Sequence, residues 1–175
     1  MFLEFKNITI RNATIEDAKQ LEIWWNDGKI MAHAGWPLGT GQKEADIAAR
    51  IQTDDDLKGR RMIIEYEHKS IGEMSYSNIG SNTAEIGIKI CDFSMQNKGL
   101  GKIILSMFIE DLFNHLHFEK IILDTNFNNK RAQHVYEQLG FKKIAINENA
   151  WKDQLGEWQT SVDYELYPTD FISFK

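Results

Sequence analysis

The segment from Gln96 to Lys102 constrains the fold of this chain more than any other stretch. It reads Gln-Asn-Lys-Gly-Leu-Gly-Lys, and it follows an apolar, strand-like run from Ala84 to Cys91. Apolar residues then recur at helical spacing, at positions Leu105, Phe108, Ile109, Leu112, Phe113 and Leu116. The pattern predicts a strand, a glycine-bearing loop and a helix, in that order.

The predicted loop has the features of an anion-binding site. Gly99 and Gly101 allow a tight turn and a close approach of a ligand to the backbone. The first N–H groups of the following helix have no partner within it, and the helix dipole places positive charge there. A phosphate would find its donors in place, and Lys98 and Lys102 add charge, although a plain structural turn would have the same sequence. The Walker loop does not fit, and the dinucleotide fingerprint fails because position 104 is Ile.

Two ordered motifs resemble one known family. Gln96, Gly99 and Gly101 fit the pattern Gln/Arg-x-x-Gly-x-Gly/Ala, which resembles the pyrophosphate loop of the GNAT superfamily of acetyl-CoA-dependent N-acetyltransferases. The segment from Asn129 to Phe141 is similar to the family signature Asn-x-x-Ala-x-x-x-Tyr-x-x-x-Gly-Phe. The motifs lie about 30 residues apart, roughly one βαβ unit. The resemblance spans most of the chain and is strongest over residues 84–141.

The first residues resemble one subgroup of that family. Arg11 to Thr14, Asp17 and the segment from Trp24 to Asp27 look like the subgroup of ribosomal-protein and aminoglycoside N-acetyltransferases. The resemblance implies acetyl-CoA as co-substrate and no metal. It implies as acceptor a primary amine of a protein N-terminus, a polyamine, an aminoglycoside or another small molecule. Two rival functions are a non-catalytic acyl-CoA-binding or sensing module on the same fold and a small ligand-binding domain without coenzyme.

Composition limits the classes of protein that fit. The 175 residues are expected to form a single domain, 1–175, and 42% hydrophobic with 26% charged residues is ordinary for a globular chain. No apolar run approaches the roughly 18 residues of a membrane span, and residues 1–11 lack a signal-peptide core. A single cysteine excludes a disulfide framework and a multi-cysteine metal site. We therefore expect a cytoplasmic protein without a membrane partner.

Net charge bears on the partner. The chain has 20 basic and 26 acidic residues, a formal charge of −6, which argues against extended nucleic-acid binding. An acidic surface favours a cationic acceptor, although solubility alone would explain it. No pair of histidines has metal-ligand spacing.

The predicted order of elements is β-α-α-β-β-β-α-β-α-β-β. This order predicts an α/β fold with a mixed, largely antiparallel sheet of about seven strands and helices on both faces, and it also resembles the GNAT fold. Residues 31–41 and 147–157 are predicted as loops, and the alternating stretch 158–166 as the last strand. If that strand lies at the sheet edge, it could pair in a dimer, so the sequence allows a monomer or a homodimer.

Acyl transfer from a thioester to an amine makes three demands on the protein. The amine must lose its proton, although a lysine-like amine has a pKa of about 10.4. The developing oxyanion must be stabilised, and the leaving thiolate benefits from a proton donor. The thioester is already activated, so no covalent intermediate is needed. Cys91 is therefore interpreted as a small hydrophobe rather than a nucleophile.

The resemblance assigns the acid and the base. Tyr136 stands where these enzymes commonly place a tyrosine near the coenzyme sulfur, although a core aromatic would fit the same helix face. Glu85 lies on the strand before the glycine loop, where several family members use a glutamate as base. It would also fit as a solvated residue or as a partner for Lys89. Glu73 on the preceding strand is the alternative base and a candidate acceptor-site residue.

The resemblance also assigns the binding residues. Coenzyme binding falls to the strand residues Ile88, Ile90 and Cys91, to the loop residues Gln96, Asn97, Lys98, Gly99, Leu100, Gly101 and Lys102, and to Asn129 and Arg131. Capping of a helix would explain Asn129 equally well. We expect Trp36 and His33, from the predicted 31–41 loop, to border the acceptor pocket, whereas Trp24 and Trp25 favour core packing.

Overall fold

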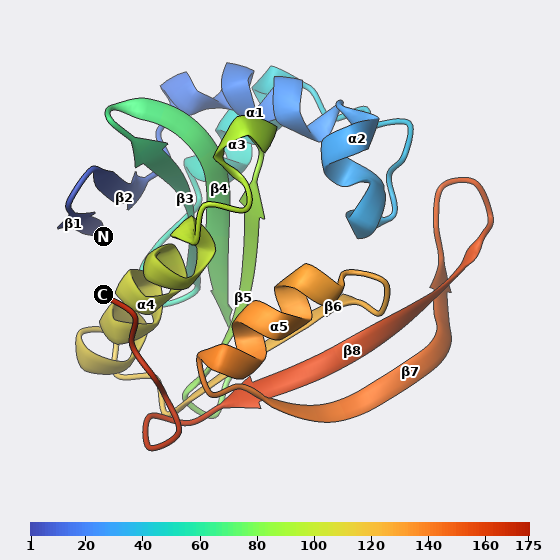
Figure 1. The fold of residues 1–175 in the computed structure, drawn as a ribbon. Coiled ribbons are helices and arrows are strands. Elements are labelled where there is room, and N and C mark those ends of the chain that lie inside the picture. Colours follow the sequence, from blue (N-terminus) through green and yellow to red (C-terminus); the bar gives the residue numbers. More distant parts are fainter.

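The computed structural model describes all residues from Met1 to Lys175. Its centre is one eight-stranded sheet with the order β1-β2-β3-β4-β5-β6-β8-β7 (Figure 1). Only β5 and β6 are parallel, so the expected mixed, largely antiparallel sheet is confirmed. The strands are β1 (Phe2–Phe5), β2 (Ile8–Asn12), β3 (Gly59–Tyr66), β4 (Lys69–Asn78), β5 (Thr83–Ile90), β6 (Lys120–Asn126), β7 (Lys142–Lys152) and β8 (Trp158–Leu166). The eighth strand arises because Lys6, with φ of 53°, turns β1 back onto β2.

Helices cover both faces of the sheet, as expected from the sequence. They are α1 (Ala18–Trp25), α2 (Gly28–Met31), α3 (Glu44–Ile51), α4 (Leu100–Asn114) and α5 (Lys130–Gln138). Strand β3 shows how the faces are divided, because successive side chains of a strand point to opposite faces. Met62 and Ile64 belong to the large core that contains the buried face of α4, whereas Ile63 packs in a second cluster with residues of α1 and α3. Trp24 and Trp25 are 7% and 8% exposed in that second cluster, which confirms core packing.

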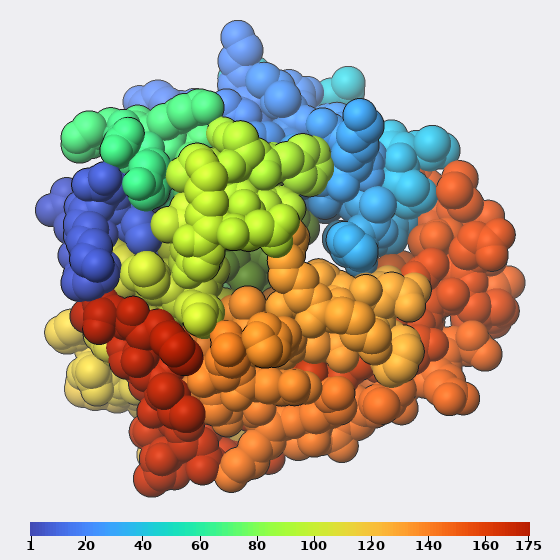
Figure 2. Space-filling view, viewed as in Figure 1, coloured from blue at the N-terminus to red at the C-terminus, as the bar shows by residue number.

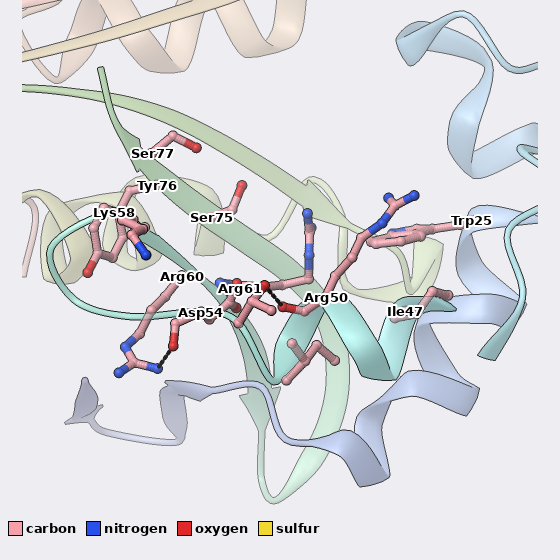
Figure 3. Close-up of a pocket in the computed structure, with 13 residues that line it drawn as sticks. Trp25, Ile47, Arg50, Asp54, Lys58, Arg60, Arg61, Ser75, Tyr76 and Ser77 are labelled. Atoms are coloured by element: carbon pink, nitrogen blue, oxygen red, sulfur yellow. Dashed lines mark hydrogen bonds between the residues drawn. The ribbon is translucent and has the colours of Figure 1, made fainter. Parts of the chain in front are cut away.

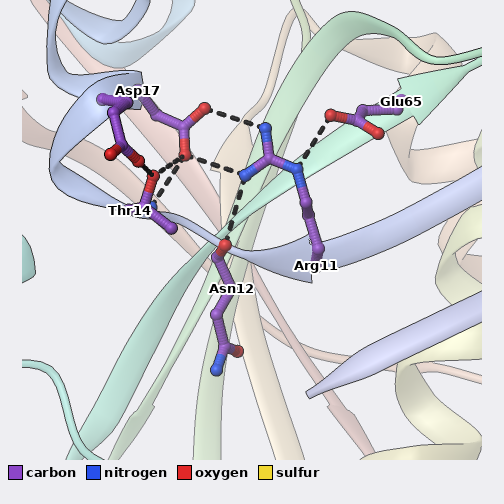
Figure 4. Close-up of polar contacts among 6 residues, drawn as sticks. Arg11, Asn12, Thr14, Asp17 and Glu65 are labelled. Carbon is purple, nitrogen blue, oxygen red and sulfur yellow. Dashed lines mark hydrogen bonds and ion pairs between the residues drawn. The ribbon is translucent and has the colours of Figure 1, made fainter.

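An ion-pair network joins the first helical segment to the sheet (Figure 4). The guanidinium of Arg11 on β2 donates to both carboxylate oxygens of Asp17, at 2.8 and 2.9 Å, and to Glu65 on β3 at 2.8 Å. Thr14 and Asp17 form a capping box at the start of this segment. Partial burial acts to raise the pKa of Asp17, but the bonds from Arg11 and Thr14 hold it below its usual value. The network thereby orients the start of α1 on the sheet.

Strands β5 and β6 separate soon after they meet. Their parallel pairing covers only Thr83–Glu85 and Lys120–Ile122. Beyond these residues β5 continues to pair with β4, while β6 pairs with β8. The second halves of β5 and β6 therefore leave a V-shaped gap in the middle of the sheet.

Two predicted loops contain regular structure. Helix α2 begins before the expected 31–41 loop, because the Asp27 side chain accepts the Lys29 N–H at 2.8 Å and caps it. Strand β7 extends through residues 147–152, which we expected in a loop. Its side chains there are mostly exposed, so no hydrophobic pattern indicates the strand. Strand β8 lies between β6 and β7, so the condition for its pairing in a dimer is not met, and β1 and β7 are the edges of the sheet. No helix of the chain combines the length and apolarity that crossing a bilayer requires.

Candidate active site

A cleft of about 860 Å³ occupies the V-shaped gap. Its walls come from the second halves of β5 and β6, the loop before α4, the first turns of α5, helix α2 and Trp151 of β7. Figure 2 shows the surface hollowed between α2 (blue), the segment after β5 (yellow-green) and α5 (orange). The two motifs that the sequence analysis singled out therefore meet at one site.

The glycine loop presents free backbone donors to the cleft. Gly99 precedes α4 in the left-handed conformation, with φ of 74°, and Asn97 has φ of 59°. The backbone N–H groups of Leu100, Gly101 and Lys102 find no acceptor in the protein. A Cβ added at Gly99 or Gly101 would meet no atom within 4 Å, so the space over the donors is open. Such a turn before a helix N-terminus suits a phosphate group.

Polar side chains hold this loop in place. The Gln96 amide donates to the carbonyl oxygen of Ile90 at 2.9 Å and accepts from Arg131 of α5 at 2.7 Å. Arg131 also donates to Asn97 at 3.3 Å, so its positive charge stands at the cleft mouth. Asn129 caps α5 by accepting the Ala132 N–H at 3.3 Å, and it lines the cleft as well.

The two lysines of the loop differ in their positions. Lys102 lines the cleft, with its ammonium 4.6 Å from the centre of the Phe174 ring. Lys98 is exposed and does not line the cleft. Of the two lysines, only Lys102 therefore belongs to the wall of the cleft.

The free edge of β5 offers backbone groups to the gap. The Ile90 carbonyl points away from β4, because it accepts from Gln96. Alternation along an antiparallel pair then directs the N–H and C=O of Ile88 into the gap as well. Cys91 lies outside the cleft, because its N–H donates to Ile71 at 2.8 Å and its side chain packs in the second cluster. Burial raises the pKa of the Cys91 thiol to about 12, which agrees with the interpretation as a small hydrophobe.

Tyr136 belongs both to the core and to the cleft. Its ring packs edge-on against Phe141 and Tyr164, with centroids 5.8 Å apart in each pair, and the residue is 7% exposed. The hydroxyl makes no hydrogen bond within the protein, and the residue lines the cleft. Burial, and secondarily the charge of Asp124, raises the pKa of Tyr136 to about 12. At neutral pH the phenol therefore keeps a proton that it can donate.

Glu85 and Glu73 stand in contrasting environments. Glu85 is the last β5 residue paired with β6, and it is exposed and outside the cleft lining. Lys89, which the sequence analysis considered as a partner for Glu85, pairs with Glu73 instead. Its ammonium lies 3.5 Å from a carboxylate oxygen of Glu73.

Glu73 is 1% exposed, accepts from Trp25 at 2.7 Å and pairs with Arg61. Burial acts to raise the pKa of Glu73, but the charges of Arg61 and Lys89 keep it below its usual value. Glu73 thus acts as a structural carboxylate that holds two cations.

The acceptor end of the cleft differs in part from the expectation. His33 lines it, as expected, together with Lys29 of α2, but Trp36 is 44% exposed and lies outside the lining. Trp151 lines the cleft instead. Its ring approaches Gly35 so closely that a Cβ there would lie 2.5 Å from it.

Sequence reasoning missed Trp151 and Asp124. Asp124 of β6 lines the cleft with an exposed side chain, and the loss of water on its cleft side together with the charge of Asp163 raises its pKa. The one available signal was an acidic residue directly after the apolar run Ile121–Leu123. Trp151 gave no signal, because it lies in the stretch that we expected to be a loop.

A second cavity, of about 340 Å³, lies between α3 and the start of β3 (Figure 3). Arg50, Lys58, Arg60 and Arg61 border it. All but Arg50 have a carboxylate partner, namely Asp55 for Lys58, Asp56 for Arg60 and Glu73 for Arg61. Its positive charge is thus largely neutralised within the protein.

Comparison with known proteins agrees with the geometry. The family described as acetyltransferase (GNAT) domain matches residues 7–142. The uncharacterised protein YdhI of Bacillus subtilis (strain 168) is 29% identical over 110 residues, which are 63% of this chain. This match spans 66% of the length of YdhI.

Solved structures share the fold over nearly the whole chain. A spermidine N-acetyltransferase from Vibrio cholerae, in complex with CoA and spermine, superimposes with a TM-score of 0.82 at 21% identity, covering 94% of this chain and 97% of that one. RimL, a ribosomal L7/L12 alpha-N-protein acetyltransferase in complex with CoA, also superimposes with a TM-score of 0.82. The identity is 15%, and the superposition covers 95% of this chain and 98% of RimL. A probable acetyltransferase superimposes with a TM-score of 0.80 at 20% identity, covering 98% of this chain and 99% of that one.

Proposed function

Because this chain belongs to the GNAT acetyltransferase family, we propose that it transfers the acetyl group of acetyl-CoA to a primary amine, by direct attack of the amine on the thioester. The observation that supports this most is the single cleft between β5 and β6, with free N–H donors at the start of α4 and the unpartnered Tyr136 hydroxyl. Acetyl-CoA supplies the activated acyl group. The protein has to bind it, orient it and move protons.

The binding residues follow the length of the cleft. The N–H groups of Leu100 to Lys102 hold the pyrophosphate, with Arg131 and Lys102 adding positive charge. The free backbone groups of Ile88 and Ile90 bond the amides of the pantetheine arm. The Vibrio cholerae enzyme and RimL, which share this fold, are both complexes with CoA, and this supports a coenzyme site in the present protein.

Two proton movements complete the reaction. Tyr136 donates a hydrogen bond to the leaving sulfur while negative charge develops there, and the departing thiolate takes its proton from solvent. Glu85 takes the proton of the attacking amine through water, because it stands where β5 and β6 separate. Glu73 is not suited to this step, because Arg61 and Lys89 occupy its oxygens and lower its affinity for a proton.

A panel of amines tests the proposal through release of free thiol from acetyl-CoA. It contains N-terminal peptides, polyamines, aminoglycosides and amino acids. We expect at least one class to accelerate thiol release well above hydrolysis. If no amine does so while acetyl-CoA still raises the melting temperature, the chain is a non-catalytic acyl-CoA-binding module. If acetyl-CoA does not stabilise the fold, no coenzyme site exists, because a ligand of the folded state must raise its stability.

A further inference from the structure

Asp124 and Asp163 form a carboxylate pair without a cation. They face each other across the antiparallel strands β6 and β8, where opposite side chains have Cβ atoms about 5 Å apart. Neither carboxylate takes part in any of the ion pairs of the protein. Asp163 accepts one hydrogen bond, from the Asn147 amide at 2.9 Å. Like charges placed directly opposite destabilise a sheet, so the pair costs stability that the fold itself does not recover.

The pair adjoins the reaction site. Asp124 lines the cleft, and so does Tyr136, whose ring is 93% buried and whose hydroxyl has no partner. The negative charge of Asp124 adds to the effect of burial in raising the pKa of the Tyr136 phenol. The Tyr136 hydroxyl, which has no partner and opens into the cleft, and the Asp124 carboxylate, which has no cation, indicate a polar ligand between the walls of the cleft.

The cationic side chains of the cleft leave Asp124 uncompensated. Lys89 is held by Glu73 at 3.5 Å. Lys29 and His33 are exposed on the α2 side, and neither pairs with Asp124. Trp151 offers an aromatic wall at the same end, and such a ring attracts ammonium groups.

We propose that Asp124, supported by Asp163, binds an ammonium group of the acceptor adjacent to the amine that reacts, so that the acceptor is a small di- or polyamine. This inference rests on the proposed acetyl transfer. Asp124 brings negative charge to the wall of the cleft, and Asp163 places a second carboxylate directly opposite it on β8. None of the lysines that line the cleft forms an ion pair with either carboxylate. An acceptor with one amine would lose its charge on attack and leave the pair uncompensated. A second ammonium restores the balance through the whole reaction.

The test compares two acceptors of equal length, 1,4-diaminobutane and butylamine, by thiol release with acetyl-CoA. We expect the wild-type protein to favour the diamine in kcat/KM by roughly 10- to 100-fold, the range of hydrogen bonds between charged groups. Asp124→Asn should reduce that ratio to about one, chiefly by raising the KM of the diamine, and Asp163→Asn should lower it less. Both variants should melt no lower than wild type, because they remove like-charge repulsion.

Glu165→Gln is the matched control. Glu165 lies two residues from Asp163 on the same face of β8, but it is opposite Ile122 and does not line the cleft. For Glu165→Gln, the ratio of kcat/KM for the diamine to kcat/KM for butylamine should equal that of the wild-type protein. A wild-type ratio near one, or a ratio that survives Asp124→Asn, overturns the inference while acetyl transfer stands. If no amine accelerates thiol release from acetyl-CoA, the result contradicts the proposed function instead. Stabilisation by Mg²⁺ or Ca²⁺ that is lost in Asp124→Asn would identify the pair as a metal site and also overturn the inference.

Discussion

Replacement of Tyr136 by Phe removes one oxygen atom from the cleft and leaves the ring in place. The ring contacts with Phe141 and Tyr164 remain, and the hydroxyl has no hydrogen bond within the protein to lose. The free energy of unfolding should therefore change by less than about 1 kcal/mol, the net value of one typical hydrogen bond. Binding of acetyl-CoA should persist, because the donors of the glycine loop are unaffected.

The expected loss of rate follows from the pKa values of the Tyr136 phenol and of the leaving thiol. Positioned proton transfer contributes about 10²- to 10⁴-fold. The pKa of Tyr136 is about 12, whereas a thiol has a pKa of about 8.5. Complete transfer of the proton to the thiolate is therefore uphill by roughly 3.5 pKa units. The phenol then acts mainly as a hydrogen-bond donor to the developing charge, and we expect a loss near the lower limit, about 100-fold in turnover.

The assay measures thiol release with acetyl-CoA and with an acyl donor that carries a more acidic leaving thiol. The defect of Tyr136→Phe should shrink with the better leaving group. Tyr164→Phe is the matched control, because its hydroxyl donates to Glu137 at 3.0 Å and does not line the cleft. It should lose some stability but retain turnover. Equal loss with both donors would mean that Tyr136 positions the coenzyme, and a wild-type rate with both would refute any role in the chemistry.

Three further variants test the other parts of the site. Gly99→Val should abolish stabilisation by acetyl-CoA in a thermal melt, because the valine would occupy the open space and resist the φ of 74°; an unchanged shift in melting temperature would exclude the phosphate loop. Glu85→Gln should lower turnover by about 10²- to 10⁴-fold at neutral pH, less at high pH where the amine is already neutral, and a rate within about threefold of wild type would exclude Glu85 as the base. Glu73→Gln should destabilise the fold by about 3–5 kcal/mol, because Arg61 and Lys89 lose their shared carboxylate. Because the folded-state pKa of Glu73 is depressed, its stabilisation is present above the unfolded pKa of about 4.3 and is lost as pH falls through the folded value. Denaturation at several pH values should therefore show a weaker acid dependence in Glu73→Gln than in wild type.

The sequence predicted the parts of the site that depend on local chemistry. The glycines before α4, the helical spacing after them and the Asn cap of α5 act within a few residues of the chain. Each of these elements lies where the pattern placed it. Tyr136 was assigned through the family resemblance, because helical periodicity alone fitted a core aromatic equally well and could not tell that its hydroxyl is left without a partner.

The tertiary structure decided which carboxylates face the cleft. Glu85 and Asp124 look alike as single acidic residues next to apolar strand positions, but only Asp124 lines the cleft. Glu73 was a candidate base until the fold brought Arg61, Lys89 and Trp25 around it. These contacts join residues of different strands and helices, and strand order cannot be read from spacing along the chain.

The separation of β5 and β6 has the same origin. Local sequence determined that two strands flank α4, but the length of their pairing depends on what each strand finds on its other side. Because β4 and β8 draw them apart, a gap opens that Trp151 closes at one end and the glycine loop at the other. The sequence by itself thus determined the elements around the glycine loop and the anion-binding chemistry of the loop. The cleft, the free Tyr136 hydroxyl and the Asp124–Asp163 pair exist only through the register of strands that are distant along the chain, because strand pairing is a non-local interaction.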